Sequence, residues 1–305
     1  MLSKFFRVAG HLFRVEAGEA LFAQMQNYAP FEVAETSAGS LHDGCTLMFA
    51  LSAVSGTSVP EYAEDTRQEE EGDIIVCGRT AAGESVFDFS LFGKRAGVLV
   101  CAPGYREATL YLCACGDSTT MQHLSRFALN NSLMVLYALA TAKFGTVLFH
   151  AAVVTYGGRG YMFLGKSGTG KSTHARLWLK HNAGSDLLND DNPVVRILES
   201  PDGSKDVRVY GSPWSGKTPC YRNEEAEIGG IVLLEQAPFN KIVRLRGVEA
   251  YAALITSISG ARWDRGVADG LHATENGLAM NVPVWFLKCL PDEEASKVCV
   301  EAVAK

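Results

Sequence analysis

The feature that most constrains the fold is a glycine-rich octapeptide at Gly165–Ser172, which reads Gly-Lys-Ser-Gly-Thr-Gly-Lys-Ser. The apolar run Tyr161–Leu164 comes directly before it, and Lys171–His181 continues with the spacing of an amphipathic helix. Glycines let consecutive backbone N–H groups turn inward without a Cβ in the way. The start of the following helix adds the positive end of its dipole. The sequence therefore predicts a strand, an anion-binding loop and a helix in that order.

The residue types in this loop fit a nucleotide phosphate site. Lys171 supplies a point charge for the β- and γ-phosphates, and the Ser172 hydroxyl is a ligand type for Mg²⁺. We therefore expect ATP and Mg²⁺ as cofactors. The residues predicted to bind them are Gly165, Ser167, Gly168, Thr169, Gly170, Lys171, Ser172 and Thr173.

A second stretch, Gly211–Thr218, satisfies the same pattern but lacks its context. It carries Pro213 and the bulky Trp214 inside the loop, and no apolar helical stripe follows it. We predict that it is not a second nucleotide site. It remains a candidate loop for contact with an acceptor or a phosphate, through Trp214, Gly216 and Lys217.

Two adjacent carboxylates, Asp190 and Asp191, follow a short apolar run downstream of the loop. An acid at a strand end beside a phosphate loop is where such sites hold Mg²⁺. A neighbouring carboxylate can accept the proton of an incoming hydroxyl. Taken alone, the pair reads as an Asx-rich turn before Pro193. Beside the phosphate loop, a catalytic and metal-binding role is favoured.

His150 lies inside the predicted strand Val147–Tyr156. A lone histidine on an apolar strand is usually a buried core residue. This strand leads by a tight turn into the strand that feeds the phosphate loop, so the ring can also reach the phosphates. The residues alone leave both interpretations open.

The chain of 305 residues is 47% hydrophobic and 20% charged, which suits one large or two modest α/β domains. The long helical pattern Thr119–Phe144, which ends at Gly145, predicts a boundary between two domains. We expect an N-terminal α+β domain of unknown role at 1–145 and an ATP-binding catalytic domain at 146–305. In the first part, Phe5–Val15 is a candidate strand, and the acidic run Glu61–Asp73 is a candidate solvated loop.

Charge and hydropathy narrow the range of partners. The net charge of −6 gives no long-range attraction for nucleic acid or an anionic membrane. Met1–Leu21 has no clean apolar core of a signal peptide, because charged residues interrupt it. We expect a cytoplasmic protein that binds neither nucleic acid nor membrane. The oligomeric state stays open, a homo-oligomer included.

The order of these elements resembles the catalytic core of HPr kinase/phosphorylase: Phe149-His150-Ala151 on a strand, a glycine turn, Gly165–Ser172, then Asp190-Asp191. The segment Gly168–Lys171 is also similar to the loop of ATP-dependent phosphoenolpyruvate carboxykinase. The resemblance covers about residues 146–245. It implies a P-loop core with a mixed β-sheet and flanking helices. It also implies that His150 supports the active site beside Lys171, that Asp190 is the base, and that Asp191 and Ser172 bind Mg²⁺.

The chain also departs from that family. Gly211–Pro219 has no acid where HPr kinases carry a metal-binding glutamate, and the N-terminal half is unlike theirs. The resemblance is closer to the HPr-kinase-related proteins of bacterial peptide-modification clusters, or to a free-serine kinase. We therefore expect phosphoryl transfer to a hydroxyl of a peptide, small protein or small molecule. The alternatives are a carboxykinase-like lyase and a non-catalytic, nucleotide-responsive binding protein. Candidate arginines for the transferring phosphate are Arg222, Arg262 and Arg265.

Overall fold

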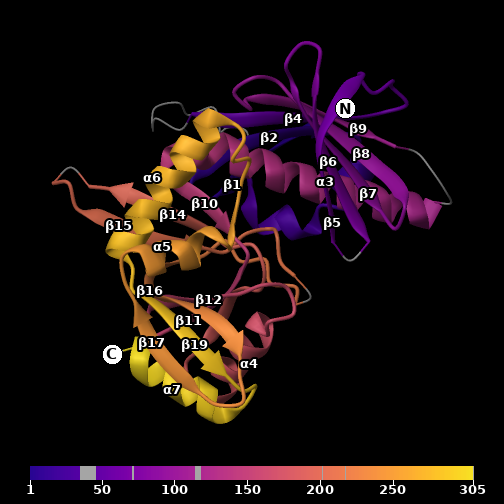
Figure 1. Cartoon of the computed structure of the whole chain (residues 1–305). Helices are drawn as coiled ribbons and strands as arrows, with labels where there is room; N and C mark the ends of the chain where they lie inside the picture. Colours follow the sequence, from indigo (N-terminus) through magenta and orange to yellow (C-terminus); the bar gives the residue numbers. More distant parts are fainter. Residues whose placement is uncertain (35–45, 71, 114–117, 201, 217, 305) are drawn as a thin grey trace. The chain divides into compact units, whose positions relative to one another are not determined.

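The computed structural model describes residues 1–34, 46–70, 72–113, 118–200, 202–216 and 218–304. The chain divides into two compact units, Met1–Ala140 and Thr141–Lys305, which are coloured from indigo to yellow along the sequence in Figure 1. Each unit combines helices with a mixed β-sheet, so the predicted α/β class is confirmed. No helix among the described residues combines the length and the apolar character needed to span a membrane.

The first unit is built on one mixed sheet. Its strands lie in the order β3-β1-β2-β4-β9-β8-β7-β6-β5, with β4 parallel to β2 and β9 and the other neighbours antiparallel. The elements are β1 (Leu2–Val8), β2 (His11–Ala17), α1 (Glu19–Phe22), η1 (Gln26–Phe31), β3 (Glu32–Val33), β4 (Leu47–Ser55), β5 (Tyr62–Glu70), β6 (Asp73–Thr80), β7 (Ser85–Leu91), β8 (Lys94–Cys101), β9 (Glu107–Leu112) and α3 (Ser118–Thr141).

Helix α3 packs on this sheet through small and aromatic residues. A Cβ at Gly97 of β8 would lie 2.9 Å from the Ala128 Cβ, so glycine lets the helix approach closely. Phe13 stacks on Phe49 at 4.8 Å between ring centroids. Tyr137 of α3 meets Phe13 edge-on and donates its hydroxyl hydrogen to the Val8 carbonyl at 3.0 Å. The core of this unit therefore lies between helix α3 and the N-terminal strands β1, β2 and β4.

Two expectations for the first unit were wrong. Phe5–Val15 is not one strand, because Ala9 and Gly10 adopt positive φ angles of 47° and 79° and turn the chain between β1 and β2. Glu61–Asp73 is not a solvated loop, because Tyr62–Glu70 forms β5 at the edge of the sheet. Charged side chains are common on edge strands, where they face water and block pairing with another sheet.

The second unit contains a second mixed sheet, in the order β13-β11-β12-β16-β15-β14-β10-β18, with β19 beside β16 and β17 beside β19. Strand β16 runs parallel to β12 and β19, and the other neighbours are antiparallel. The elements are η3 (Ala142–Phe144), β10 (Thr146–Phe149), β11 (Ala151–Tyr156), β12 (Arg159–Leu164), α4 (Lys171–His181), β13 (Asp186–Asn189), β14 (Val194–Glu199), β15 (Lys205–Tyr210), β16 (Glu225–Gln236), β17 (Lys241–Leu245), α5 (Val248–Ile255), β18 (Ile258–Ser259), α6 (Arg265–Asn281), β19 (Val284–Cys289) and α7 (Glu293–Val303).

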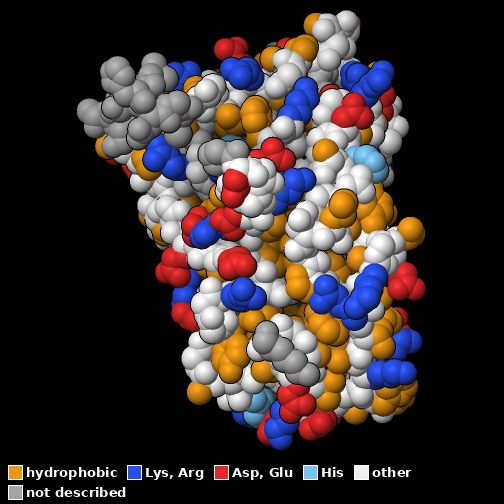
Figure 2. Space-filling model, turned by 90° about the vertical axis from the view of Figure 1, so that its left-hand side faces the viewer, with side chains coloured by type: hydrophobic (Ala, Val, Ile, Leu, Met, Phe, Trp, Pro, Cys, Tyr) orange, Lys and Arg blue, Asp and Glu red, His pale blue; other side chains and the backbone are white. Residues whose placement is uncertain are grey.

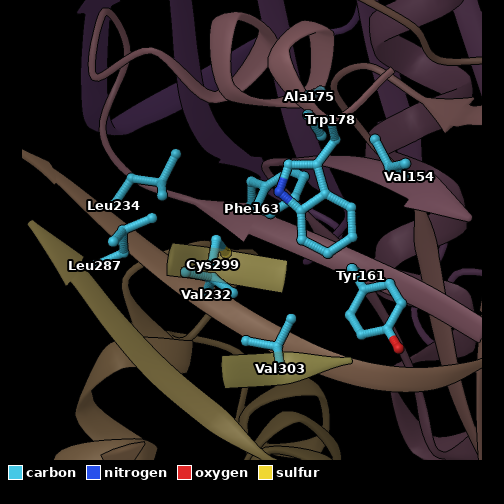
Figure 3. Packing of buried hydrophobic residues seen from close by; sticks show 11 residues of the cluster. Val154, Tyr161, Phe163, Ala175, Trp178, Val232, Leu234, Leu287, Cys299 and Val303 are labelled. Atoms are coloured by element: carbon cyan, nitrogen blue, oxygen red, sulfur yellow. The ribbon is translucent and has the colours of Figure 1, made fainter. Parts of the chain in front are cut away.

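Trp178 anchors helix α4 to the sheet. Its side chain is 0% exposed and lies among Tyr161 and Phe163 of β12, at 5.1 and 5.3 Å between ring centroids. Cys299 and Val303 of α7 close the same cluster, as Figure 3 shows. The buried face of α4 thus fixes the helix whose first residues belong to the glycine-rich loop.

The outer surface carries apolar side chains as well. Figure 2 shows hydrophobic side chains exposed among lysines and arginines over the lower half of the face it displays. In the second unit, Val248 and Met280 are among the most exposed of them, at 84% and 85%. Single exposed apolar residues are normal on protein surfaces.

The Trp178–His174 contact predicts a pH dependence of stability. The indole Nε1–H donates to His174 Nε2 at 3.2 Å, and burial lowers the pKa of His174 from 6.5 to about 4. Protonation therefore favours the unfolded chain, and stability is lost as pH falls from the unfolded pKa towards the folded one. We expect a loss of about 3 kcal/mol in the free energy of unfolding between pH 6.5 and 4.

This pH dependence can be measured in the second unit selectively, because all four tryptophans lie in it. Urea unfolding would be followed by indole fluorescence across that pH range. His174→Gln keeps an acceptor for the indole but does not titrate, so its pH profile should be flatter. An equally steep profile in the variant would assign the effect to other groups.

Candidate active site

The glycine-rich loop joins β12 to α4 in the second unit, as the motif predicts. Gly165, Gly168 and Gly170 have φ angles of 151°, 75° and 108°, which side chains other than glycine rarely adopt. A Cβ at Gly165 would also lie 3.0 Å from the Thr169 side chain. The first intrahelical bond of α4 runs from the His174 N–H to the Gly170 carbonyl at 2.8 Å. The amides of Lys171, Ser172 and Thr173 therefore precede the helical ladder and suit an anion.

Lys171 folds back into this loop. Its side chain is buried, and Nζ donates to the carbonyls of Gly165 at 2.9 Å and Lys166 at 3.3 Å. Ser172 is half-buried and Thr173 is exposed at the start of the helix. Ser167 is exposed within the loop. The ammonium group is thus held inside the ring of backbone groups where a phosphate would be cupped.

The sheet of the second unit is interrupted at two neighbouring places, one between β10 and β11 and one between β13 and β14. The predicted strand Val147–Tyr156 is in fact two, because β10 ends at Phe149 and β11 begins at Ala151, with His150 between them. The Ala151 N–H donates to the Asp191 carbonyl at 2.8 Å, and the His150 N–H donates to the Ser257 carbonyl at 2.7 Å. The break between β13 and β14 contains Asp190 and Asp191. The two interruptions bring His150 and the aspartates together.

Asp191 and His150 are in direct contact. His150 Nδ1 lies 3.3 Å from Asp191 Oδ1, and the two side chains are 42% and 30% exposed. Asn192 Nδ2 donates to the other carboxylate oxygen at 2.8 Å. Burial raises the pKa of Asp191, while the charges of His150 and Lys171 oppose that rise. The Asp191 carboxylate is thus held by His150 at one oxygen and by Asn192 at the other.

Asp190 is more deeply buried than Asp191, with 4% of its surface exposed. Its Oδ2 accepts a hydrogen bond from the Thr218 N–H at 3.1 Å. Thr218, at the end of the Gly211–Thr218 motif, therefore contacts the aspartate pair directly. No helix follows this loop, consistent with the prediction that it is not a second nucleotide site. A Cβ at Gly216 would lie 3.1 Å from the Asp191 Cβ and 3.4 Å from the Asp190 carbonyl oxygen.

The other two candidates in this loop have different places. The Trp214 indole is only 5% exposed, so its ring does not form an open wall for an acceptor. Its carbonyl instead accepts from the Asn192 N–H at 3.2 Å. Lys217 lies outside the described residues. The backbone of this loop contacts the aspartate segment through the Trp214 carbonyl and the Thr218 N–H.

Sequence reasoning missed two residues that shape this site. Asn189 is 0% exposed; its Oδ1 accepts from the Asp191 N–H at 2.9 Å and its Nδ2 donates to Ser212 Oγ at 3.1 Å. Ser212 Oγ donates in turn to the Asn192 carbonyl at 2.6 Å. Together they tie the aspartate turn to the loop after β15. Their only sequence signal was proximity to the two motifs.

The candidate arginines are engaged elsewhere. Arg222 pairs with Asp186, at the other end of β13 from Asp190. Arg262 donates to Glu275, a fully buried carboxylate of α6, at 2.6 Å. Arg265 is 95% exposed and lies 3.9 Å from Asp269. None of these contacts directs a guanidinium to the phosphate loop.

No protein-family model matches the chain, and no curated protein matches it. Function therefore has to be argued from the site itself. Its elements are a loop that can cup an anion, a buried lysine within it, and two carboxylates beside a histidine.

A divalent cation suits the oxygen donors of this site. The Asp191 carboxylate and the Ser172 hydroxyl are hard ligands of the kind that Mg²⁺ prefers. Among the described residues, no three His, Cys, Asp or Glu side chains gather as a metal centre. Mg²⁺ commonly keeps one or two protein ligands and completes its shell with phosphate oxygens and water. The donor set fits a cation that arrives with a nucleotide.

Proposed function

We propose that this chain is an ATP-dependent kinase that transfers the γ-phosphate to a hydroxyl of a peptide, a small protein or a small molecule such as serine. The observation that carries the proposal is the buried Lys171 ammonium group, which the carbonyls of Gly165 and Lys166 hold inside a loop of positive-φ glycines. The two aspartates lie between β13 and β14, where Asp191 contacts His150. The resemblance to the HPr kinase core, with the same order of histidine, loop and aspartates, supports the same reading.

Each residue then has a defined task. The loop amides and Lys171 bind the β- and γ-phosphates, and Lys171 offsets charge that develops during transfer. Ser172 and Asp191 would hold Mg²⁺, which neutralises phosphate oxygens and orients them for in-line attack. Asp190 accepts the proton of the attacking hydroxyl, and His150 positions Asp191 through its Nδ1 contact. Catalysis of this kind rests on positioning and charge.

The proposal is tested by a transfer screen with γ-labelled ATP. Acceptors would be free serine, small phosphate-carrier proteins and peptides, and Lys171→Ala would serve as the inactive control. Label in an acceptor that depends on Lys171 is the expected result. Tight ATP binding without transfer to any acceptor would instead favour the nucleotide-responsive binding protein. ATP-dependent decarboxylation of oxaloacetate would favour the lyase.

The loop over the aspartates gives a second test. Gly216→Val would push side-chain carbons against Asp191, so we expect up to about 10²-fold slower transfer, the loss typical of a misplaced catalytic group. Gly18→Val is the control, because nothing lies within 4 Å of a Cβ built there. Steady-state rates of both variants, with thermal melts to verify folding, check this. Full activity in Gly216→Val would show that the loop tolerates displacement.

A further inference from the structure

A cavity of about 540 Å³ lies beside the phosphate loop in the second unit. It opens where the three parallel strands β12, β16 and β19 end. The loop residues Gly168–Gly170 form one side, and residues 236–238 and 289–291, which follow or end β16 and β19, form another. The lining is completed by Thr173, His174 and Leu177 of α4 and by Leu234 of β16. Ligands of open α/β sheets bind outside the carboxyl ends of the parallel strands.

The chemistry of this cavity differs from that of the phosphate loop. None of the described lining residues is Asp, Glu, Lys or Arg, and Leu177, Leu234, Pro238, Leu290 and Pro291 make it largely apolar. An apolar cavity with a few placed polar groups suits a flat, uncharged ring. Because it adjoins Gly168–Gly170, a ring there can belong to the same molecule as the bound phosphates.

Gln236 links this cavity to the loop. It is the last residue of β16, and its Nε2 donates to the carbonyls of Gly168 at 3.2 Å and Thr169 at 3.3 Å. These contacts with two carbonyls identify this end of the side chain as the amide nitrogen and the other end as the oxygen. Within the described part of the chain, no donor contacts Oε1. That oxygen is therefore left as an acceptor on a residue that lines the cavity.

We propose that the cavity holds the base of the nucleotide, and that Gln236 is a positioning and specificity-determining residue. Its N–H groups clamp the phosphate loop, and its Oε1 accepts a hydrogen bond from an exocyclic amine of a purine base. The proposal rests on the proposed nucleotide site. It adds where the nucleoside lies and why adenine is preferred over a base with a carbonyl at the same position.

The first experiment compares three ligands by calorimetry in the presence of Mg²⁺: ATP, ITP and tripolyphosphate. ATP should bind at least tenfold more tightly than tripolyphosphate, because only ATP buries a base. ATP should bind about three- to tenfold more tightly than ITP, which corresponds to the net free energy of one hydrogen bond. Equal affinities for ATP and tripolyphosphate would overturn the cavity assignment and leave the phosphate site standing. Equal affinities for ATP and ITP would overturn the role of Oε1. If neither ATP nor tripolyphosphate binds, the proposed function itself fails.

Two leucines of α4 provide a matched pair of variants. Leu177 lines the cavity, whereas Leu179 is 36% exposed and does not. Leu177→Trp should fill the cavity and weaken ATP at least tenfold while tripolyphosphate binds as before. Leu179→Trp should change neither. Equal ATP affinity in both variants would place the base elsewhere.

Gln236 variants separate the hydrogen bonds to the loop carbonyls from recognition of the base by Oε1. Gln236→Met keeps the length of the side chain but donates nothing, so tripolyphosphate should bind more weakly. Gln236→Lys keeps donors for the loop carbonyls and should restore tripolyphosphate binding. Both lack Oε1 and should lose the preference for ATP over ITP. Wild-type behaviour in Gln236→Met would overturn the positioning role.

Cys289 offers a readout independent of affinity. It is half-buried, lines the cavity, and burial raises the pKa of its thiol to about 11. Alkylation with N-ethylmaleimide in alkaline buffer, mapped by peptide mass spectrometry, would report access. MgATP should slow alkylation at Cys289, and magnesium tripolyphosphate should not. Equal rates with the two ligands would contradict a base in this cavity.

Discussion

Asp190→Asn is expected to lower the rate of phosphoryl transfer by about 10²–10⁴-fold, the usual contribution of a general base. The amide cannot accept the hydroxyl proton. It can still accept the hydrogen bond that the Thr218 N–H now makes to Asp190 Oδ2 at 3.1 Å. The local backbone should therefore be preserved, and ATP should bind as in the wild type. The measurement is kcat with saturating MgATP, together with the Kd for ATP.

Two matched variants interpret that result. Asp186→Asn makes the same change at the start of β13, the strand that precedes Asp190, at a residue paired with Arg222, and should leave kcat near the wild-type value. Asp191→Asn should mainly raise the Mg²⁺ concentration needed for activity, because Asp191 is the proposed metal ligand. Robust turnover in Asp190→Asn would remove the proposed base. Loss of ATP binding in that variant would show a structural role instead.

The parts of this site that could be predicted from sequence are those set by neighbouring residues. The helix Lys171–His181 has the predicted bounds, because hydrophobic spacing and a flanking glycine act locally. The placement of glycines in the phosphate loop belongs to the same class.

The parts that escaped prediction depend on partners far along the chain. The strand around His150 breaks because β10 pairs with β14 and β18, whereas β11 pairs with β12 and β13. Helix α5 ends at Ile255 for a related reason, since Ile258 pairs with Phe149 at the sheet edge. Asn189 and Gln236 were missed because an amide in sequence carries no sign of what it binds.

Trp178→Ala is expected to lower the free energy of unfolding of the second unit by about 3–5 kcal/mol. The indole is fully buried, packs on two rings of β12, and donates to His174 at 3.2 Å. Its removal leaves a cavity and a buried imidazole nitrogen without its donor, and both effects destabilise. Urea unfolding followed by far-UV circular dichroism and by the remaining tryptophans measures the loss.

Trp263→Ala is the matched control, because it removes the same side chain from the same unit at a site that is 47% exposed. It should cost under about 1 kcal/mol. A comparable loss in both variants would show that the cluster beneath α4 is not the centre of stability.

Trp178→Ala also tests whether the buried cluster beneath α4 supports the candidate site. Trp178 lies on the helix that begins with Lys171 and Ser172, so a loosened α4 should also hold the phosphate loop less firmly. A ligand that binds only the folded unit stabilises it by RT ln(1 + [L]/Kd). Saturating MgATP should therefore recover part of the stability lost in Trp178→Ala, and much less in Trp178→Ala/Lys171→Ala. If MgATP stabilises both equally, the nucleotide binds without the loop lysine, and the site must be sought away from the start of α4.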